Sequence, residues 1–185
     1  MRIFSAGIVL IVAMVGFSAC KLGCLERVDK TLRNGWQGSF DVRIERTPEA
    51  CALFAAVSGA NYLISSRRGT SGEWKKIAIV HHDDPLEIPK DSIVVKNENI
   101  AYASLFRLFV VTVDGGKSWK TFDIDKRLPG MEPSQGQYRN WVVIKNIDIA
   151  DTGLGKMYLE RSRYDNGAAT VLSTTTFGQD WSTEK

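Results

Sequence analysis

The feature that most restricts the fold of this chain is a plan that occurs three times: an apolar strand, a turn rich in Ser, Thr and Gly, and a tryptophan. The three copies occupy residues 61–74, 108–119 and 170–181. Their tryptophans are about 45 and about 62 residues apart, close to the length of one four-stranded blade of a β-propeller. A repeat of this kind predicts a domain assembled from similar antiparallel sheets.

The rest of the chain after Trp36 also has the composition of short strands. Runs rich in Val, Ile, Thr, Phe and Tyr alternate with Gly, Asn, Asp and Pro. Because a closed propeller needs about four blades, we expect an all-β domain over residues 36–185, with two or three blade-like antiparallel sheets as an incomplete propeller or a sandwich. The predicted strands are 39–44, 52–57, 61–66, 75–80, 92–96, 100–103, 108–113, 119–124, 141–144, 157–161 and 170–175.

The middle copy contains residues that suit a tight hairpin turn. Gly115 and Gly116 tolerate the positive φ angles of such a turn, and the Asp114 carboxylate can accept hydrogen bonds from turn N–H groups. With Thr112 and Trp119 they resemble the Asp-box, the hairpin motif of sialidase-like propellers and related β domains. The resemblance implies a turn-forming role for Asp114, and a direct binding or catalytic role is the alternative.

The other two copies match the Asp-box less closely. The third has Thr176 where the motif has Asp, and the first has an insertion before Trp74. The motif positions kept in the third copy are Thr174, Gly178 and Trp181.

The N-terminal segment has the order of a secretory signal. Arg2 is followed by an apolar run over residues 3–17 and by small residues before Cys20. The run is shorter than the roughly 20 residues of a membrane-spanning helix, which favours cleavage. Ser18, Ala19 and Cys20 resemble the lipobox of bacterial lipoproteins, which implies removal of residues 1–19 and acylation of Cys20. An ordinary signal peptide and an uncleaved anchor are the alternatives.

Lipidation of Cys20 would leave one pair of cysteines, Cys24 and Cys51, in an oxidising compartment. The pair predicts a disulfide that closes a loop of about 27 residues and stabilises the fold by about 3 kcal/mol in the chain-entropy description. The alternative is that Cys51 is a buried thiol within its apolar surroundings. Residues 20–35 are expected to form a lipidated tether, although their apolar spacing also fits a short helix.

Composition and motifs argue against several functions. The formal net charge is +3 and the basic residues are dispersed, which argues against a nucleic-acid ligand. A sialidase-like hydrolase needs a whole propeller to assemble its acid, nucleophile and arginine cluster, and the sequence has no Gly-x-Ser-x-Gly nucleophile motif. We therefore expect a protein that is not an enzyme and uses no cofactor.

Two loops are candidates for binding a protein partner. One holds both histidines of the chain in the tetrad 81–84, which is followed by Pro85. Because adjacent residues on a strand point to opposite faces, we expect a solvated strand end and loop there rather than a metal site. The other loop, 127–139, is long and rich in Pro and Gly, and such loops often carry recognition. The candidate partner-binding residues are His81, His82, Asp83, Asp84, Met131, Tyr138 and Arg139.

The lipobox, the chain length and the Asp-box-like turn together are similar to small immunity lipoproteins of the Tli type, which protect bacteria against type VI secreted lipase effectors. The resemblance implies an inhibitor that faces the periplasm, is anchored in the cell envelope and binds a protein toxin tightly. Lys21 after the acylated cysteine favours the outer membrane. The alternatives are a structural or assembly lipoprotein of the envelope, and a carbohydrate-binding module that stacks sugars on Trp36 and Trp141.

Overall fold

The computed structural model describes residues 28–50, 57–127, 142–161 and 170–183, and these form three four-stranded antiparallel sheets. The strands of sheet A are β1 (Lys30–Trp36), β2 (Phe40–Ala50), β3 (Val57–Arg68) and β4 (Lys75–His82). Those of sheet B are β5 (Ile93–Val95), β6 (Ala101–Leu105), β7 (Leu108–Thr112) and β8 (Lys120–Asp123), followed by the short helix α1 (Ile124–Arg127). Sheet C is made of β9 (Val142–Ile149), β10 (Gly155–Arg161), β11 (Thr170–Thr174) and β12 (Ser182–Thr183).

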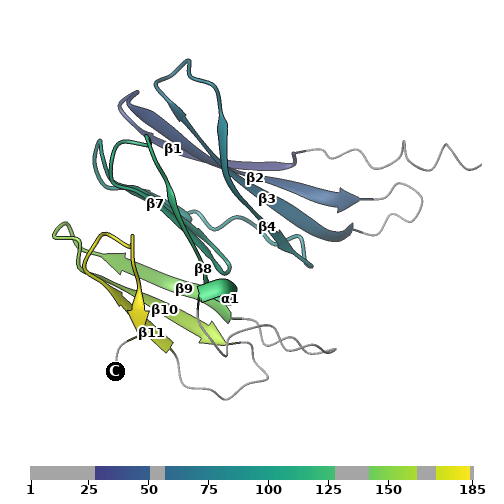
Figure 1. The fold of residues 1–185 in the computed structure, drawn as a ribbon. Coiled ribbons are helices and arrows are strands. Elements are labelled where there is room, and N and C mark those ends of the chain that lie inside the picture. Colours follow the sequence, from purple (N-terminus) through teal and green to yellow (C-terminus); the bar gives the residue numbers. More distant parts are fainter. Residues whose placement is uncertain (1–27, 51–56, 128–141, 162–169, 184–185) are drawn as a thin grey trace, which may run out of the picture.

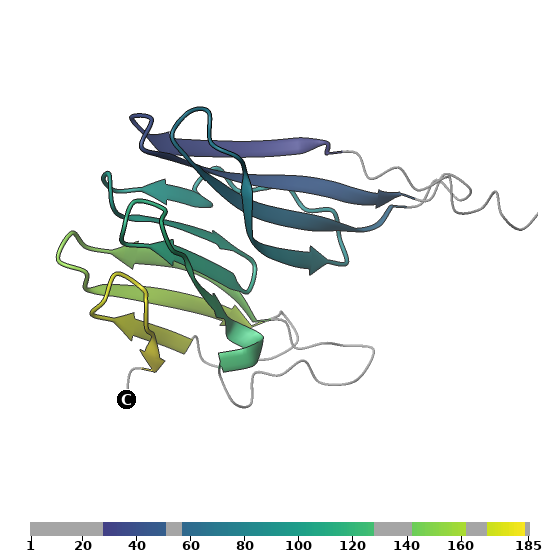
Figure 2. The same cartoon turned by 45° about the horizontal axis from the view of Figure 1, so that its top comes forward.

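The three sheets are stacked as layers, with sheet B in the middle (Figures 1 and 2). Within each sheet the strands lie in the order of the sequence, as in the blades of a propeller. The stack is open, because sheets A and C lie on opposite sides of sheet B and do not meet (Figure 2). The prediction of an all-β fold built from blade-like antiparallel sheets is confirmed.

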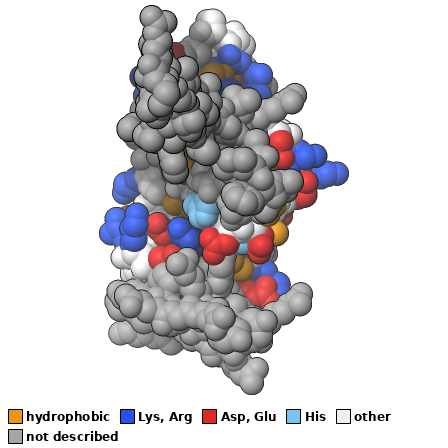
Figure 3. Space-filling view, turned by 90° about the vertical axis from the view of Figure 1, so that its right-hand side faces the viewer, with side chains coloured by type: hydrophobic (Ala, Val, Ile, Leu, Met, Phe, Trp, Pro, Cys, Tyr) orange, Lys and Arg blue, Asp and Glu red, His pale blue; other side chains and the backbone are white. Residues whose placement is uncertain are grey.

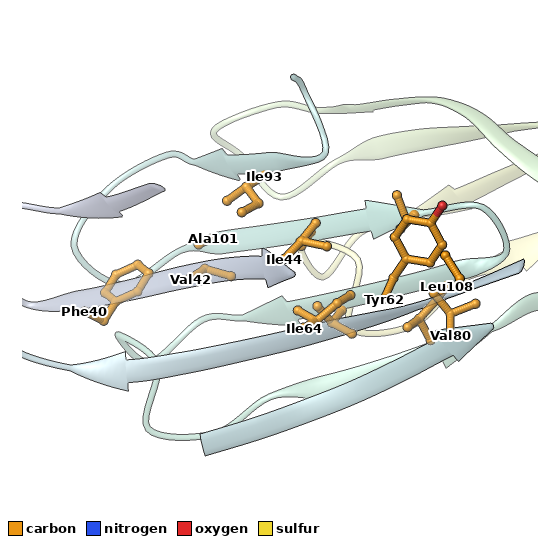
Figure 4. Close-up of a cluster of buried hydrophobic side chains, with 13 residues drawn as sticks. Phe40, Val42, Ile44, Tyr62, Ile64, Val80, Ile93, Ala101 and Leu108 are labelled. Carbon is orange, nitrogen blue, oxygen red and sulfur yellow. The ribbon is translucent and has the colours of Figure 1, made fainter. Parts of the chain in front are cut away.

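Alternation of apolar and polar residues explains how the layers pack. In β2, Phe40, Val42 and Ile44 point toward sheet B and form a core with its apolar side chains (Figure 4). A second core lies between sheets B and C and includes Phe109 and Met157. Each fully buried large side chain contributes about 1.5–3 kcal/mol. Because sheet B is covered on both faces, every residue of β7 is buried.

The first strand begins earlier in the sequence than expected. Residues 20–35 are predicted as a tether with the option of a short helix, but from Lys30 onward the chain is extended and pairs with β2, with Leu32 opposite Ile44. Leu32 packs against the core, while most of β1 is exposed at the edge of sheet A. The sheet therefore includes residues that the sequence assigns to the tether.

The N-terminal predictions concern residues outside the described part of the chain. These are the signal peptide, Cys20, Cys24 and also Cys51, so lipidation and the disulfide stay predictions. No helix in the described ranges is long and apolar enough to cross a bilayer.

The turns of the three repeats lie together at one end of the stack. The hairpins β3–β4, β7–β8 and β11–β12 all reach the left side of Figures 1 and 2, which we call the turn end. The described chain enters β1 from the opposite end, where β4 finishes. The two ends therefore present different loops to solvent.

Candidate functional site

The turn between β7 and β8 is held together by Thr112 and Asp114. The Thr112 hydroxyl donates to Asp114 Oδ1 (2.8 Å) and accepts from the Gly116 N–H (3.0 Å). The Asp114 carboxylate also accepts from the Ser118 N–H (2.9 Å) and the Ser118 hydroxyl (2.6 Å). Gly115 and Gly116 have φ of 70° and 76°. The Asp114 carboxylate is thus occupied within the turn itself.

The β11–β12 hairpin has the same geometry without an acid. Thr174 Oγ1 accepts from the Gly178 N–H (3.0 Å), and Thr176 Oγ1 accepts from the Asp180 N–H (3.1 Å). Phe177 and Gly178 have φ of 56° and 84°, as the two glycines have in the middle copy. A threonine hydroxyl therefore takes the place of the Asp-box carboxylate.

The two hairpins should respond differently to acid. Although partial burial acts in the opposite direction, hydrogen bonds from Ser118 and Thr112 lower the pKa of Asp114 from 3.8 to about 2. The carboxylate therefore stabilises the fold fully above about pH 4, and this contribution is lost as the pH falls through about 2. We expect Asp114→Asn to cost about 1–3 kcal/mol of unfolding free energy at pH 7 and only a small part of that at pH 2, measured by urea denaturation across this range.

Thr176→Val is the matched control for this experiment, because it removes the corresponding hydroxyl and no ionisable group. Its cost should not change between pH 7 and pH 2. An equally constant cost for Asp114→Asn would contradict the role assigned to the carboxylate.

The tryptophans of the second and third repeats point toward the preceding sheet. Trp119 of sheet B packs on the core that it shares with sheet A. Trp181 of sheet C packs on the next core, and its ring meets Phe109 of sheet B edge to face at 5.4 Å. A glycine of each turn also lies against the preceding sheet: a Cβ on Gly116 would be 3.3 Å from Cβ of Phe40, and one on Gly178 would be 2.7 Å from Cζ of Phe109. Each Asp-box-type hairpin therefore seals the contact between its own sheet and the one before it.

Trp74 of the first repeat has no preceding sheet among the described residues. It lies on the outer face of sheet A, on the side away from sheet B. The guanidinium carbons of Arg43, Arg67 and Arg33 lie 4.1, 4.8 and 5.7 Å from the centre of its ring. Cation–π contacts of this kind contribute about 0.5–1 kcal/mol when exposed and more when water is excluded.

Ion pairs fix the arginines around Trp74. Arg67 Nε donates to Asp41 Oδ2 (2.9 Å), and Arg33 donates to the same oxygen. Burial of Asp41 opposes ionisation, but these two arginines still hold its pKa below the usual range. Arg43 pairs with Glu45 at 3.2 Å. We call the set formed by Trp74 and these five charged side chains the Arg–Trp face.

The tetrad 81–84 is only partly the solvated segment that the sequence predicts. His82 is 8% exposed, and its ring lies 4.5 Å from that of Phe106. The Asp84 N–H donates to His82 Nδ1 (3.0 Å), and burial lowers the pKa of the His82 ring. By contrast, Asp83 and Asp84 are exposed, and His81 Nε2 lies 3.4 Å from Asp83 Oδ1. His82 is therefore a packing residue, whereas His81 is partly exposed and Asp83 and Asp84 are exposed. Figure 3 shows histidine and acidic side chains near one another on this face of the molecule.

A cleft of about 430 Å³ opens beside His82, between the loop after β4 and strands of sheets B and C. Tyr102, Phe106, Ile144 and Asn146 are among the residues that line it. No three His, Cys, Asp or Glu residues within the described ranges are grouped as a metal site. The cleft is thus a mixed polar and apolar opening.

Arg46, which the sequence analysis missed, holds one wall of this cleft in place. Its Nε and Nη2 donate to the two carboxylate oxygens of Asp29 (2.9 and 2.6 Å), and its Nη1 donates to the carbonyls of Pro85 and Leu86 (2.8 and 2.9 Å). The side chain is buried and points toward sheet B, as Phe40, Val42 and Ile44 do. The signal in the sequence is a charged residue at an inward position of an alternating strand.

The remaining candidate residues divide between the core and the part of the chain that is not described. Met131, Tyr138, Arg139 and Trp141 lie outside the described residues. Trp36 is partly buried and packs against the core between sheets A and B.

Comparisons with protein-family models, with curated proteins and with solved structures give no match to this chain. Its function therefore has to be inferred from its own side chains.

Proposed function

We propose that this chain is a binding protein, anchored in the bacterial cell envelope through an acyl group on Cys20, and that its Arg–Trp face captures a secreted protein toxin. The observation that carries the proposal is the place of Trp74. Trp119 and Trp181 each fill the contact with a preceding sheet, whereas Trp74 lies over the arginines on the outer face of sheet A, which no described sheet covers. A partner protein that covers this face would complete the packing pattern of the repeat.

The composition of the Arg–Trp face supports this role. Trp and Arg are the side chains that most often dominate the free energy of protein–protein binding. Arg43 and Arg67 are only 24% and 16% exposed, so their neighbours already hold them in place and little side-chain entropy remains to be lost on binding. Ile79 of β4 lies on the same side of sheet A and is 53% exposed, which adds an apolar contact at the margin.

The charge of the face favours an acidic partner. Arg33, Arg43 and Arg67 are balanced by only two carboxylates, those of Asp41 and Glu45. Lys76 lies on the same side of the sheet, because it pairs with Ser65 and Ser65 pairs with Arg43. Excess positive charge speeds encounter with an acidic surface and disfavours basic ones. An inhibitor of this kind acts by covering the toxin and needs no catalytic group of its own.

The test is site-specific crosslinking in the native host. A photo-reactive residue in place of Ile79, in the full-length chain, should trap one protein that kills cells when it is produced alone in the periplasm. Trp74→Ala should lower its affinity for the unmodified chain by about 30-fold or more, as for a central interface residue, and should abolish protection of those cells. Affinity is measured with the purified pair, and protection by survival.

Two further variants separate the face from the rest of the molecule. Tyr158→Ala, on the outer side of sheet C, should leave affinity and protection unchanged. Cys20→Ser should keep the affinity but move the chain out of the membrane fraction. A trapped protein that is harmless in the periplasm would overturn the proposal, as would an equal loss of affinity from Tyr158→Ala.

A further inference from the structure

A second cleft, of about 350 Å³, lies at the turn end between sheets A and B. Its walls are the hairpin between β3 and β4 and the Asp-box turn between β7 and β8. The volume is in the range of small-molecule pockets, which is about 300–1,000 Å³. Neither the Asp-box hydrogen bonds nor the Arg–Trp face accounts for it.

Positive charge is concentrated in this cleft. Arg68, Lys75 and Lys117 line it, against the single acid Glu73. The backbone of Arg67 also borders the cleft, but its guanidinium is on the outer face of sheet A, paired with Asp41. Arg68, Lys75 and Lys117 form no ion pair with a described acid. Like charges that share one cleft repel one another, so an anion bound among them would relieve that repulsion. The fold thus brings together basic residues that are dispersed along the sequence.

The backbone around the cations is held firmly. Lys117 follows Gly116, whose N–H is bound by Thr112 and whose Cα lies against Phe40 of sheet A. On the other wall, the Gly69 N–H donates to the Ser39 carbonyl (3.0 Å), which ties the β3–β4 turn to the β1–β2 turn. Fixed walls of this kind reduce the conformational cost of binding a ligand.

We propose that this cleft binds a phosphate group, with Arg68, Lys75 and Lys117 as the residues that hold it. A phosphate carries up to two negative charges on a compact set of oxygens, each of which can accept charge-assisted hydrogen bonds from Lys and Arg. It therefore neutralises several cations at once, which a single carboxylate does not. The group could be carried by a soluble phosphorylated molecule or by a lipid headgroup.

The experiment measures binding of pyrophosphate to the full-length chain by calorimetry at low ionic strength. The unmodified chain should bind it saturably, and added salt should weaken the binding. The double variant Lys75→Ala/Lys117→Ala should lower the affinity about tenfold or more, because two charge-assisted contacts are lost. Both side chains are exposed, so the variant should fold normally.

A matched control and a lipid probe complete the design. Lys90→Ala removes an exposed lysine outside the cleft and should change the affinity less than about twofold. The lipid probe compares vesicles that contain phosphatidic acid and phosphatidylcholine with vesicles of phosphatidylcholine alone. Stronger binding to the vesicles with phosphatidic acid, if the double variant loses it, would assign the site to a lipid headgroup. Pyrophosphate binding without that extra vesicle binding would assign it to a soluble ligand. Absence of saturable binding to both probes, or an equal loss from Lys90→Ala, would overturn the proposal.

Discussion

Replacing Gly178 with Ala is expected to lower the free energy of unfolding by about 2–4 kcal/mol, from left-handed backbone strain and overpacking together. Gly178 has φ of 84°, and a Cβ there would lie 2.7 Å from Cζ of Phe109 and 3.1 Å from Cζ2 of Trp181. Both rings are packed in the core between sheets B and C, so they cannot retreat without opening that contact. Urea denaturation, followed by tryptophan fluorescence, measures the change.

Gly38→Ala separates the two causes. Gly38 has nearly the same φ, 79°, but a Cβ there would meet only Thr70 Cγ2 at 3.7 Å, an ordinary contact. It should therefore cost only the backbone strain, about 1–2 kcal/mol. Equal losses for the two variants would mean that the close approach of Gly178 to sheet B does not stabilise the stack.

Arg46→Met should also destabilise the fold by about 2–4 kcal/mol. The change keeps most of the apolar volume but leaves Asp29 without its bidentate partner and the carbonyls of Pro85 and Leu86 without their donor. Asp29 is one-third exposed, so water compensates part of the loss. Besides urea denaturation, amide exchange should become faster around Leu86, because Arg46 fastens that loop to sheet A.

Arg33→Met is the control for Arg46→Met, since the Arg33 side chain is 50% exposed and its ion pair with Asp41 lies at the surface. It should cost less than about 1 kcal/mol. When introduced into the Arg46→Met variant, Asp29→Ala should hardly change the free energy of unfolding, because the two residues act as one pair. If Arg46→Met lowers the free energy of unfolding no more than Arg33→Met does, the hydrogen bonds of the buried arginine do not stabilise the fold as inferred.

Local sequence signals were sufficient for the architecture but not for the edges of the sheets. The predicted runs 39–44 and 108–113 coincide with β2 and β7 to within one residue at each shared end, because β2 has one face in a core and β7 has both. β1 was missed because an exposed edge strand has few buried positions, and its Leu32 also fits a helical spacing with the apolar residues before it. The two-residue strand β12 is too short to carry any period.

The candidate site depends on relations between sheets, which a single sequence does not encode locally. The Asp-box residues were identified because a tight hairpin needs particular residue types at fixed positions. Trp74 is buried or exposed according to which face of sheet A packs against sheet B. The residues near Trp74 do not determine which face that is. The burial of His82 was missed for the same reason, since its partner Phe106 belongs to another sheet.

Because every sheet uses only consecutive strands, the layers can assemble in the order in which the chain emerges during synthesis or export. Sheet A has all its strands once residue 82 has appeared, but its apolar face toward sheet B stays exposed to water until sheet B has formed. The middle layer waits longest for full cover, since in the described part of the chain the second face of sheet B, which carries Phe109 and Val111, is covered by sheet C, whose first strand begins at Val142. A chain whose synthesis or export stops between sheets B and C would thus expose an apolar face of sheet B to chaperones and proteases.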